Sequence, residues 1–377
     1  MKNLFLLLAL WPFLGFAQSL TNGTNIPMIK TWSQEPNGHS YPIFIHVPNT
    51  AVPEGGFPVC ILLHGNGGNG APMIGQFRDK LDCYVLVAPS GYANTWNISD
   101  ESSEAPDVEM IGHLIDSLQN YSNINPNKIR IFGSSNGAAL ANRVFIENKN
   151  PGLDMVCAAV SQLSEAQYRN GSFYYPDGAT GGTDPYDGYN VATTPITGRK
   201  YLSICNINDP IIPYNGGAAV GVNFIPAQEA SFIVAQSQGF NGAQIAGMGN
   251  DLGNNVFEFS YLSGEVVHLQ GTAGHALNST QETYLINFLE NCNGSSTAIE
   301  ARKQLDFHIS PNPSASVITI SGDILQPLPY ELLSIHGQSL KKGTLSATDR
   351  QIDLSALPAN VYFLQIANQN RKIIKSP

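Results

Sequence analysis

Charged side chains are scarce in this 377-residue sequence, and basic ones are the scarcer kind. Only 13% of the residues are charged, and 19 Lys and Arg stand against 29 Asp and Glu, which gives a formal net charge of -10. A protein that binds nucleic acid needs a basic surface to contact the phosphates. The acidic balance therefore argues against a nucleic-acid partner.

Cysteine is also sparse: there are five, none in a CxxC spacing, and the sequence has no HxxxH pair either. Zinc sites commonly use such spacings, so we expect no metal, and the chemistry inferred below requires no cofactor. Five cysteines cannot all pair within one chain. Three of them lie in apolar runs and are expected to be buried core residues: Cys60, Cys157 and Cys205.

Long apolar runs are confined to the N-terminus. Lys2 precedes an apolar run over residues 4–16, and small residues, Gly15 and Ala17, occupy the two cleavage positions. This pattern is typical of a secretory signal peptide, which we place at residues 1–17. The run is shorter than the ~20 residues that a membrane-spanning helix needs. We expect a soluble mature protein with no stable membrane span.

The two ends of the chain differ in charge and in pattern. Residues 1–299 hold 11 Lys and Arg against 23 Asp and Glu (-12), whereas residues 300–377 hold 8 against 6 (+2). Small polar residues over 293–304 fit a linker. Short β-like runs separated by turn residues follow, and they predict a small all-β domain, an Ig-like sandwich, over 305–377.

Between residues 18 and 292, short apolar runs alternate with amphipathic stretches. Several runs are continuously apolar, as strands buried on both faces of a parallel sheet are. This alternation predicts a three-layer α/β domain. Strands are expected at 41–48, 57–65, 83–91, 128–134, 155–163, 200–209 and 266–274, and helices at 107–121, 136–149, 227–238 and 281–292.

One motif points to a nucleophile. Gly133-Ser134-Ser135-Asn136-Gly137 matches G-x-S-x-G between an expected strand and an expected helix. The chain turns so sharply in that setting that side chains two residues on either side of the serine would collide with backbone. The turn exposes the Ser135 hydroxyl at a helix N-terminus, which favours negative charge. Ser135 is our candidate nucleophile; the alternative is a serine in an ordinary Gly-rich turn.

A second Gly-rich turn, residues 64–68, ends the strand expected at 57–65. Backbone N–H groups there can stabilise an oxyanion, a contribution of ~3 kcal/mol per donor. The candidate donors are the N–H of Asn136 and one from Asn66 or Gly67; the alternative is a plain tight turn. His64 itself is expected to be a structural hydrogen-bonding residue.

A serine nucleophile needs a histidine base that is oriented by a carboxylate. In an α/β sheet enzyme of this kind the chain order is Ser, acid, His. Asp209 closes the strand expected at 200–209, and His275 lies on a loop just before the last helix. His268 falls inside an apolar strand and is expected in the core. Three other histidines precede the nucleophile and have the wrong order: His39, His46 and His113.

Two aspartates, Asp184 and Asp187, lie in an acidic loop over residues 177–190. The loop reads as a cap or surface insertion. Spaced aspartates of this kind can bind Ca²⁺, but a solvated acidic loop is the favoured interpretation.

These segments resemble a known family. CILLHGNGG (60–68), SGYANTWN (90–97), residues 106–145, NDPIIPYNGG (208–217) and AGH (273–275) are similar to feruloyl esterases and polyhydroxybutyrate depolymerase-like esterases of the α/β-hydrolase superfamily. The resemblance implies a triad of Ser135, Asp209 and His275. The sequence departs from the family at NIND (206–209), where HGTxD is usual, and at AGHALN (273–278), where polyester depolymerases often carry an aromatic after the histidine.

The C-terminal residues resemble a different family. FHISPNPSASVITISGDI, YELLSIHGQSLKKG and IDLSALPANVYFLQIAN, followed by RKIIK, look like the C-terminal sorting domain of the type IX secretion system of Bacteroidetes, over about residues 305–377. This resemblance implies handling by the type IX secretion machinery, export across the outer membrane and cleavage of the tail. The alternative is an unrelated Ig-like or carbohydrate-binding module.

Together these features predict a secreted serine esterase that works through an acyl-enzyme. Feruloyl or acetyl groups on plant polysaccharides are the first expected substrates, and polyhydroxybutyrate or synthetic polyesters are the alternative. A serine peptidase and a non-catalytic surface binding protein are further alternatives. Three aromatic residues are candidates for the substrate cleft, and the alternative is that they belong to the core: Tyr92, Trp96 and Tyr214.

Overall fold

The computed structural model describes residues 18–178, 185–289, 307–322, 328–334, 338–346, 348–366 and 369–377. The expected signal peptide (1–17) and linker (293–304) lie outside the described residues. The chain divides into two compact units, Met1–Ala298 and Ile299–Pro377, and each is considered by itself. Among the described residues, no helix is both long and apolar enough to cross a membrane.

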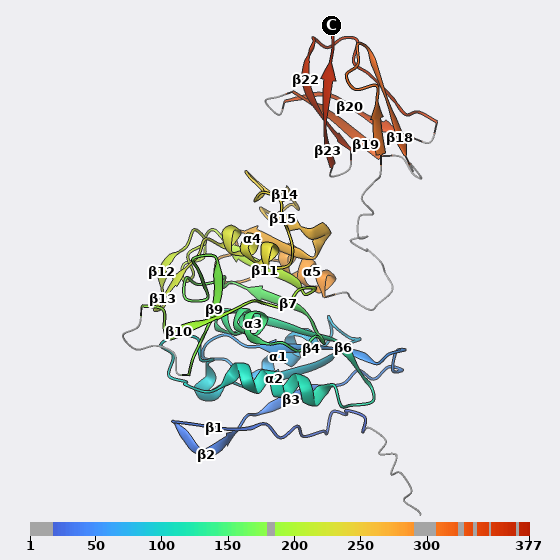
Figure 1. Ribbon diagram of the computed structural model, residues 1–377. Helices are drawn as coiled ribbons and strands as arrows, with labels where there is room; N and C mark the ends of the chain where they lie inside the picture. Colours follow the sequence, from blue (N-terminus) through green and yellow to red (C-terminus); the bar gives the residue numbers. More distant parts are fainter. Residues whose placement is uncertain are drawn as a thin grey trace, which may run out of the picture. The chain divides into compact units, whose positions relative to one another are not determined.

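The first unit is built on one mixed sheet of nine strands (Figure 1). Its order is β14 (Asn250–Asp251), β15 (Phe257–Tyr261), β16 (Val266–Gly271), β11 (Lys200–Asn206), β7 (Leu153–Ala159), β6 (Ile124–Ser134), β4 (Phe57–Leu63), β5 (Val85–Pro89) and β3 (Ile43–His46). The six strands from β16 to β5 run parallel. β3, β15 and β14 pair antiparallel at the two edges.

Helices cover both faces of this sheet (Figure 1), and alternate residues of β4 show why. Ile61 and Leu63 belong to the apolar cluster that contains α2 (Asp107–Leu118), α3 (Asn136–Glu147) and α4 (Ala227–Ser237). Cys60 and Leu62 belong to the cluster on the other face, with α1 (Gly70–Phe77) and α5 (Ser279–Phe288). All of β4 is buried, so the continuously apolar run has core on both sides. The three-layer α/β arrangement expected from the sequence is confirmed.

Smaller sheets decorate this frame. A hairpin of β1 (Ile29–Trp32) and β2 (Glu35–Ser40) precedes the central sheet in the chain. After β7 come β8 (Tyr168–Arg169), β9 (Ser172–Pro176) and β10 (Tyr189–Thr193), which form a three-stranded sheet. After β11 comes a hairpin of β12 (Gly217–Ala219) and β13 (Val222–Phe224). The last two insertions follow strands at their carboxyl ends, where the candidate site also lies.

Cysteine burial agrees with the sequence interpretation. Cys60, Cys157 and Cys205 are free and buried, whereas Cys83 is disulfide-bonded. Burial raises the pKa of the Cys60 thiol to about 12 and that of Cys205 to about 12. These thiols are inert core groups.

The second unit consists of two antiparallel sheets. One contains β17 (Phe307–Ser310), β18 (Val317–Gly322) and β21 (Gln351–Asp353); the other contains β20 (Ser339–Leu345), β19 (Leu328–Leu333), β22 (Asn360–Ile366) and β23 (Gln369–Lys375). Side chains from both sheets share one apolar core, including Ile318 and Ile320 from the first and Leu364 and Ile373 from the second. The unit is all-β as expected, and its Ig-like topology stays a prediction.

Candidate active site

Ser135 lies where β6 ends and α3 begins, with φ 56° and ψ -122°. L-residues rarely adopt a positive φ outside functional turns. The turn is tight because backbone passes close on both sides. A Cβ at Gly133 would lie 2.1 Å from the carbonyl oxygen of Gly137, and a Cβ at Gly137 would lie 2.3 Å from that of Leu63. Neither glycine of G-x-S-x-G can therefore be replaced by a larger residue without moving the neighbouring backbone.

The structure brings Ser135, His275 and Asp209 together from three loops at one edge of the sheet. His275 Nε2 lies 2.8 Å from Ser135 Oγ, and His275 Nδ1 lies 2.8 Å from Asp209 Oδ2. A carboxylate only accepts hydrogen bonds, so Nδ1–H donates to Asp209 and Nε2 is left to accept from the Ser135 hydroxyl. This is the tautomer in which histidine can take a proton from serine.

Asp209 is held in place by its own loop. Its Oδ1 accepts hydrogen bonds from the N–H groups of Ile211 at 2.8 Å and Ile212 at 3.0 Å, and its side chain is only 2% exposed. The strand expected to end at Asp209 ends at Asn206 instead. The carboxylate therefore sits in a turn beyond the strand, which carries it across to His275.

Two backbone N–H groups beside Ser135 have no acceptor among the residues that the structure describes: those of Asn66 and Asn136. Asn136 is the first residue of α3, so its N–H is one of the donors that a helix leaves unpaired. Leu63 pairs with Gly133 across β4 and β6, which places the turn after β4 beside Ser135. The Gly67 N–H donates to the Asn94 carbonyl at 2.8 Å. Of the two donors expected from this turn, Asn66 is the available one.

His64 has a structural role, as expected. Its Nε2 accepts from the Gly91 N–H at 3.0 Å, so Nδ1 carries the proton and donates to the Gly65 carbonyl at 2.8 Å. Burial lowers the pKa of His64, which keeps the ring neutral. His64 thus fixes the Gly-rich turn against the segment that follows β5.

His268 is a core residue, also as expected. It is fully buried, lies 3.0 Å from the Tyr214 hydroxyl through Nε2, and its pKa is lowered by burial to about 3.

Two of the three aromatic residues predicted for the substrate cleft belong to the core, and for these the prediction is wrong. Trp96 is fully buried, and its indole N–H donates to the His64 carbonyl at 2.8 Å. Tyr214 is 9% exposed and donates to Gln270 Oε1 at 3.0 Å. Trp96 is thus bonded to the turn after β4, and Tyr214 to strand β16.

Tyr92, the third aromatic residue, is partly exposed. Its ring packs edge-on against the rings of Trp32 in β1 and His39 in β2, with ring centroids 5.0 Å and 5.1 Å apart. Its contact with substrate stays a prediction.

Sequence reasoning missed the residues that hold the backbone donors. The Asn136 side chain accepts from the Trp96 N–H at 2.8 Å and donates to Glu101 Oε1 at 3.0 Å. Glu101 Oε2 in turn accepts from the N–H groups of Ile98 and Ser99. No local motif marks Glu101, because its link to the site is the hydrogen bond from Asn136, a residue of another element.

Asp107 is the first residue of α2 and is only 1% exposed. Its Oδ2 accepts from the Asn97 N–H at 2.8 Å and its Oδ1 from the Tyr41 hydroxyl at 3.2 Å. Burial raises the pKa of Asp107 to about 7. Its structural role is to anchor the segment that carries Glu101.

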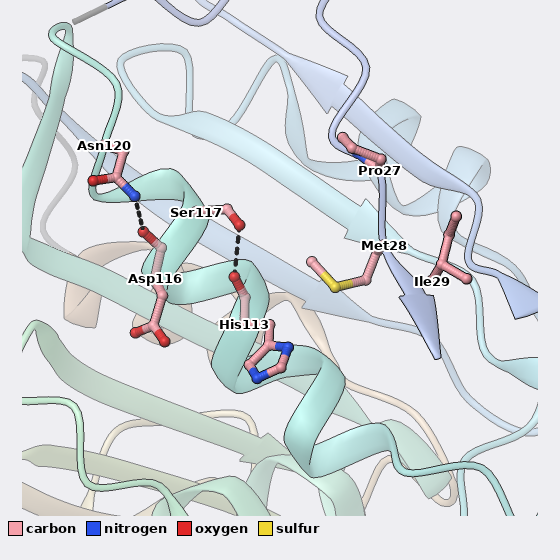
Figure 2. A pocket seen from close by; sticks show the side chains of 7 residues that line it. All are labelled: Pro27, Met28, Ile29, His113, Asp116, Ser117 and Asn120. Carbon is pink, nitrogen blue, oxygen red and sulfur yellow. Dashed lines mark hydrogen bonds between the residues drawn. The ribbon is translucent and has the colours of Figure 1, made fainter. Parts of the chain in front are cut away.

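Two surface hollows lie away from Ser135. One, of about 310 Å³, runs between residues 27–29 and α2 (Figure 2), where Ser117 and Asn120 hydrogen-bond to carbonyls of α2. The other, of about 630 Å³, is lined by Glu165, Tyr186, Asp187 and residues of the β12–β13 hairpin. Neither is lined by the Ser135–His275–Asp209 group.

The acidic loop falls partly outside the described residues, which include Asp187 but not Asp184. Among the residues that are described, no group of three or more His, Cys, Asp or Glu is placed to hold a metal ion. Calcium binding by this loop stays a prediction.

Comparisons with known proteins identify the C-terminal residues. The family model for the secretion system C-terminal sorting domain matches residues 308–376. A search of curated protein sequences found no match.

Among solved structures, an acetyl xylan esterase from Aspergillus awamori is similar over 65% of this chain and 93% of its own, at 15% identity and TM-score 0.45. A Bacillus cereus carboxylesterase is similar over 66% and 93%, at 13% identity and TM-score 0.42. A poly(3-hydroxybutyrate) depolymerase from Bordetella parapertussis is similar over 46% and 62%, at 16% identity and TM-score 0.33. The sorting domain directs this protein through the type IX secretion machinery to the cell surface or the medium.

Proposed function

We propose that this protein is an exported serine carboxylic ester hydrolase. The observation that carries the proposal is the unbroken hydrogen-bond chain from Ser135 through His275 to Asp209, with 2.8 Å at each step. Two backbone N–H groups, those of Asn66 and Asn136, lie beside it without an acceptor among the described residues. Nucleophile, base, orienting carboxylate and oxyanion donors are the parts that acyl transfer needs.

The reaction proceeds in two steps. His275 takes the proton from Ser135 Oγ as this oxygen attacks the ester carbonyl carbon, and the resulting oxyanion is held by the Asn66 and Asn136 N–H groups. The tetrahedral intermediate collapses, the C–O bond to the alcohol breaks, and His275 gives its proton to the departing alkoxide. Water then attacks the acyl-enzyme with His275 again as base, which releases the acid and restores Ser135. The proton taken from Ser135 thus leaves with the alcohol, and the attacking water supplies the proton that restores Ser135.

Esterified plant polysaccharides, carrying feruloyl or acetyl groups, are the proposed substrates. Export supports this proposal because such polymers cannot enter the cell. The resemblance of residues 60–68, 106–145 and 208–217 to feruloyl esterases supports it further. The acidic first unit, with its charge of -12 over residues 1–299, favours neutral over anionic polymers.

One observation favours a polyester as the second candidate. Ile207 and Ile211 flank Asp209 and are 49% and 45% exposed. Asp209 receives a hydrogen bond from the Ile211 N–H, so the backbone that carries this apolar side chain is fixed beside the orienting carboxylate. Exposed aliphatic side chains at this position suit an apolar polymer chain better than a sugar chain.

The test is hydrolysis by the mature protein and by Ser135→Ala, with Ser134→Ala as the matched control from the same turn. The panel is p-nitrophenyl acetate and butyrate, methyl ferulate, acetylated xylan, a polyhydroxybutyrate film and a peptide p-nitroanilide. We expect ester cleavage to fall at least about 10³-fold in Ser135→Ala and to persist in Ser134→Ala. Equal activity of wild type and Ser135→Ala contradicts the mechanism. Cleavage of the anilide alone makes the protein a peptidase.

A further inference from the structure

The amide of Asn206 joins the end of β11 to the loop that carries His275. Asn206 is fully buried, and its Nδ2 donates two hydrogen bonds, each of 2.8 Å, to the carbonyls of Gly274 and Ala276. These are the residues immediately before and after His275. The loop between β16 and α5 has no regular secondary structure. The two hydrogen bonds from the Asn206 amide connect this loop to the end of β11.

A second buried amide orients the first. Asn206 Oδ1 accepts from Gln281 Nε2 at 2.8 Å, and Gln281 is also fully buried. Gln281 completes a capping box at the start of α5: its N–H donates to Asn278 Oδ1, and its Oε1 accepts from the Asn278 N–H. A capping box fixes the first turn of a helix. The Asn206 amide therefore has a rigid partner and one orientation, with Nδ2 toward the His275 loop.

Space for this link is provided by Gly271. Asn206 and Gly271 face each other across β11 and β16. A Cβ at Gly271 would lie 2.2 Å from Gln281 Nε2 and 2.4 Å from Asn206 Oδ1. The hydrogen bond between the two amides passes directly over the glycine, so the three residues form one unit.

We infer that Asn206 is a positioning residue for His275, an inference that rests on the proposed function. The His275 ring must stay within hydrogen-bond distance of two groups: its Nε2 lies 2.8 Å from Ser135 Oγ, and its Nδ1 lies 2.8 Å from Asp209 Oδ2. By holding the carbonyls on both sides of His275, Asn206 fixes the backbone position from which the imidazole side chain extends. A displacement of about 1 Å at a reacting group costs on the order of 10²-fold in rate.

The link also explains a departure in sequence. Asn206 begins the segment NIND, where the family that this chain resembles usually has HGTxD. When the two aspartates are aligned, the glycine of that pattern falls at position 206. A glycine there has no side chain to donate to the two carbonyls. In this chain the asparagine supplies both hydrogen bonds, with Gly271 and Gln281 as its complements.

The experiment compares Asn206→Ala in the wild-type and in the His275→Ala background, in the full mature chain with p-nitrophenyl butyrate. We expect Asn206→Ala to lower kcat about 10- to 100-fold with KM within about twofold. In the His275→Ala background it should lower the residual kcat by less than about twofold, because its effect passes through His275. Asn142→Ala is the matched control: Asn142 is an equally buried asparagine that hydrogen-bonds the Tyr201 hydroxyl, and its loss should leave kcat within about twofold.

Two results overturn the inference: a kcat for Asn206→Ala within twofold of wild type, or the same fold-loss in both backgrounds, which marks a general structural effect. If Asn206→Ala does not fold, Gln281→Ala enters the same cycle, with an expected loss of about 3- to 10-fold that again vanishes without His275. Failure of the proposed function is separate, because it appears as undiminished activity of Ser135→Ala.

Discussion

Replacing Gly137 by alanine tests whether the turn around Ser135 holds the two proposed oxyanion donors, the N–H groups of Asn66 and Asn136, at their spacing. The new Cβ would lie 2.3 Å from the Leu63 carbonyl oxygen and 2.5 Å from that of His64. Real Cβ contacts essentially never fall below 3.0 Å, so the start of α3 and the end of β4 must separate by at least about 0.7 Å. Both obstacles are backbone atoms, one in the last residue of the buried strand β4 and one in the residue that follows it, and no rotamer change removes them.

The movement separates the Asn136 N–H from the Asn66 N–H, because the first belongs to α3 and the second to the turn after β4. We expect overpacking to lower the free energy of unfolding by ~1–3 kcal/mol. Loss of one oxyanion donor lowers kcat by about 10²- to 10³-fold, and we expect Gly137→Ala to approach that range. Urea unfolding and the kcat for p-nitrophenyl butyrate measure the two effects.

Gly75→Ala is the control for a glycine-to-alanine change as such. Gly75 lies in α1, and a Cβ there meets nothing within 4 Å. Alanine in an open helical position should raise the free energy of unfolding by about 1 kcal/mol and leave kcat unchanged. A Gly137→Ala enzyme whose kcat stays within twofold of wild type refutes the argument that this contact sets the oxyanion geometry.

Three further predictions follow from buried groups. Burial raises the pKa of Asp107 from 3.8 to about 7, so its favourable contribution is full below pH 4 and is lost as the pH rises through 7. Between pH 6 and 8 the free energy of unfolding should therefore fall by about 1.4 kcal/mol more in wild type than in Asp107→Asn; parallel pH curves contradict this. Asp209→Asn should lower kcat on the order of 10³- to 10⁴-fold at unchanged stability, since an amide no longer holds the His275 tautomer; a loss below tenfold in p-nitrophenyl butyrate assays would count against that role. Three buried cysteines, Cys60, Cys157 and Cys205, should not react rapidly with a thiol reagent at pH 8 until the protein is unfolded in urea. Fast labelling of the native protein would show that at least one of these thiols is accessible.

The parts of the fold that could be predicted are those with a strong local pattern. Buried parallel strands leave continuous apolar runs, and each of the seven runs identified overlaps one strand of the central sheet. The helix α1 was missed because GAPMIGQF is short and carries two glycines and a proline, which are poor helix formers. The hairpin of β1 and β2 was missed because its second strand, EPNGHS, is polar and largely exposed. Such elements form through tertiary contacts, which local pattern does not report.

In the candidate site, too, the residues with a strong local pattern could be predicted and the others could not. Ser135, Asp209 and His275 could be found because each follows a recognisable strand, and carboxyl ends of parallel strands meet at one edge. Trp96 and Tyr214 were misplaced because an aromatic residue in a loop looks the same whether it faces a cleft or the core. Their hydrogen-bond partners in the core, His64 and Gln270, are distant in sequence.

Position 206 shows how a departure from a family pattern becomes informative once its contacts are known. Read alone, NIND in place of HGTxD bears only on the acyl pocket. The structure shows that Asn206 points to the His275 loop and to Gln281, and that Gly271 leaves room for this link. Three residues from two strands and a helix thus act as a set. A substitution at any one of them is expected to act on kcat through His275, whereas exposed Ile207 and Ile211 are free to change substrate preference without disturbing the catalytic geometry.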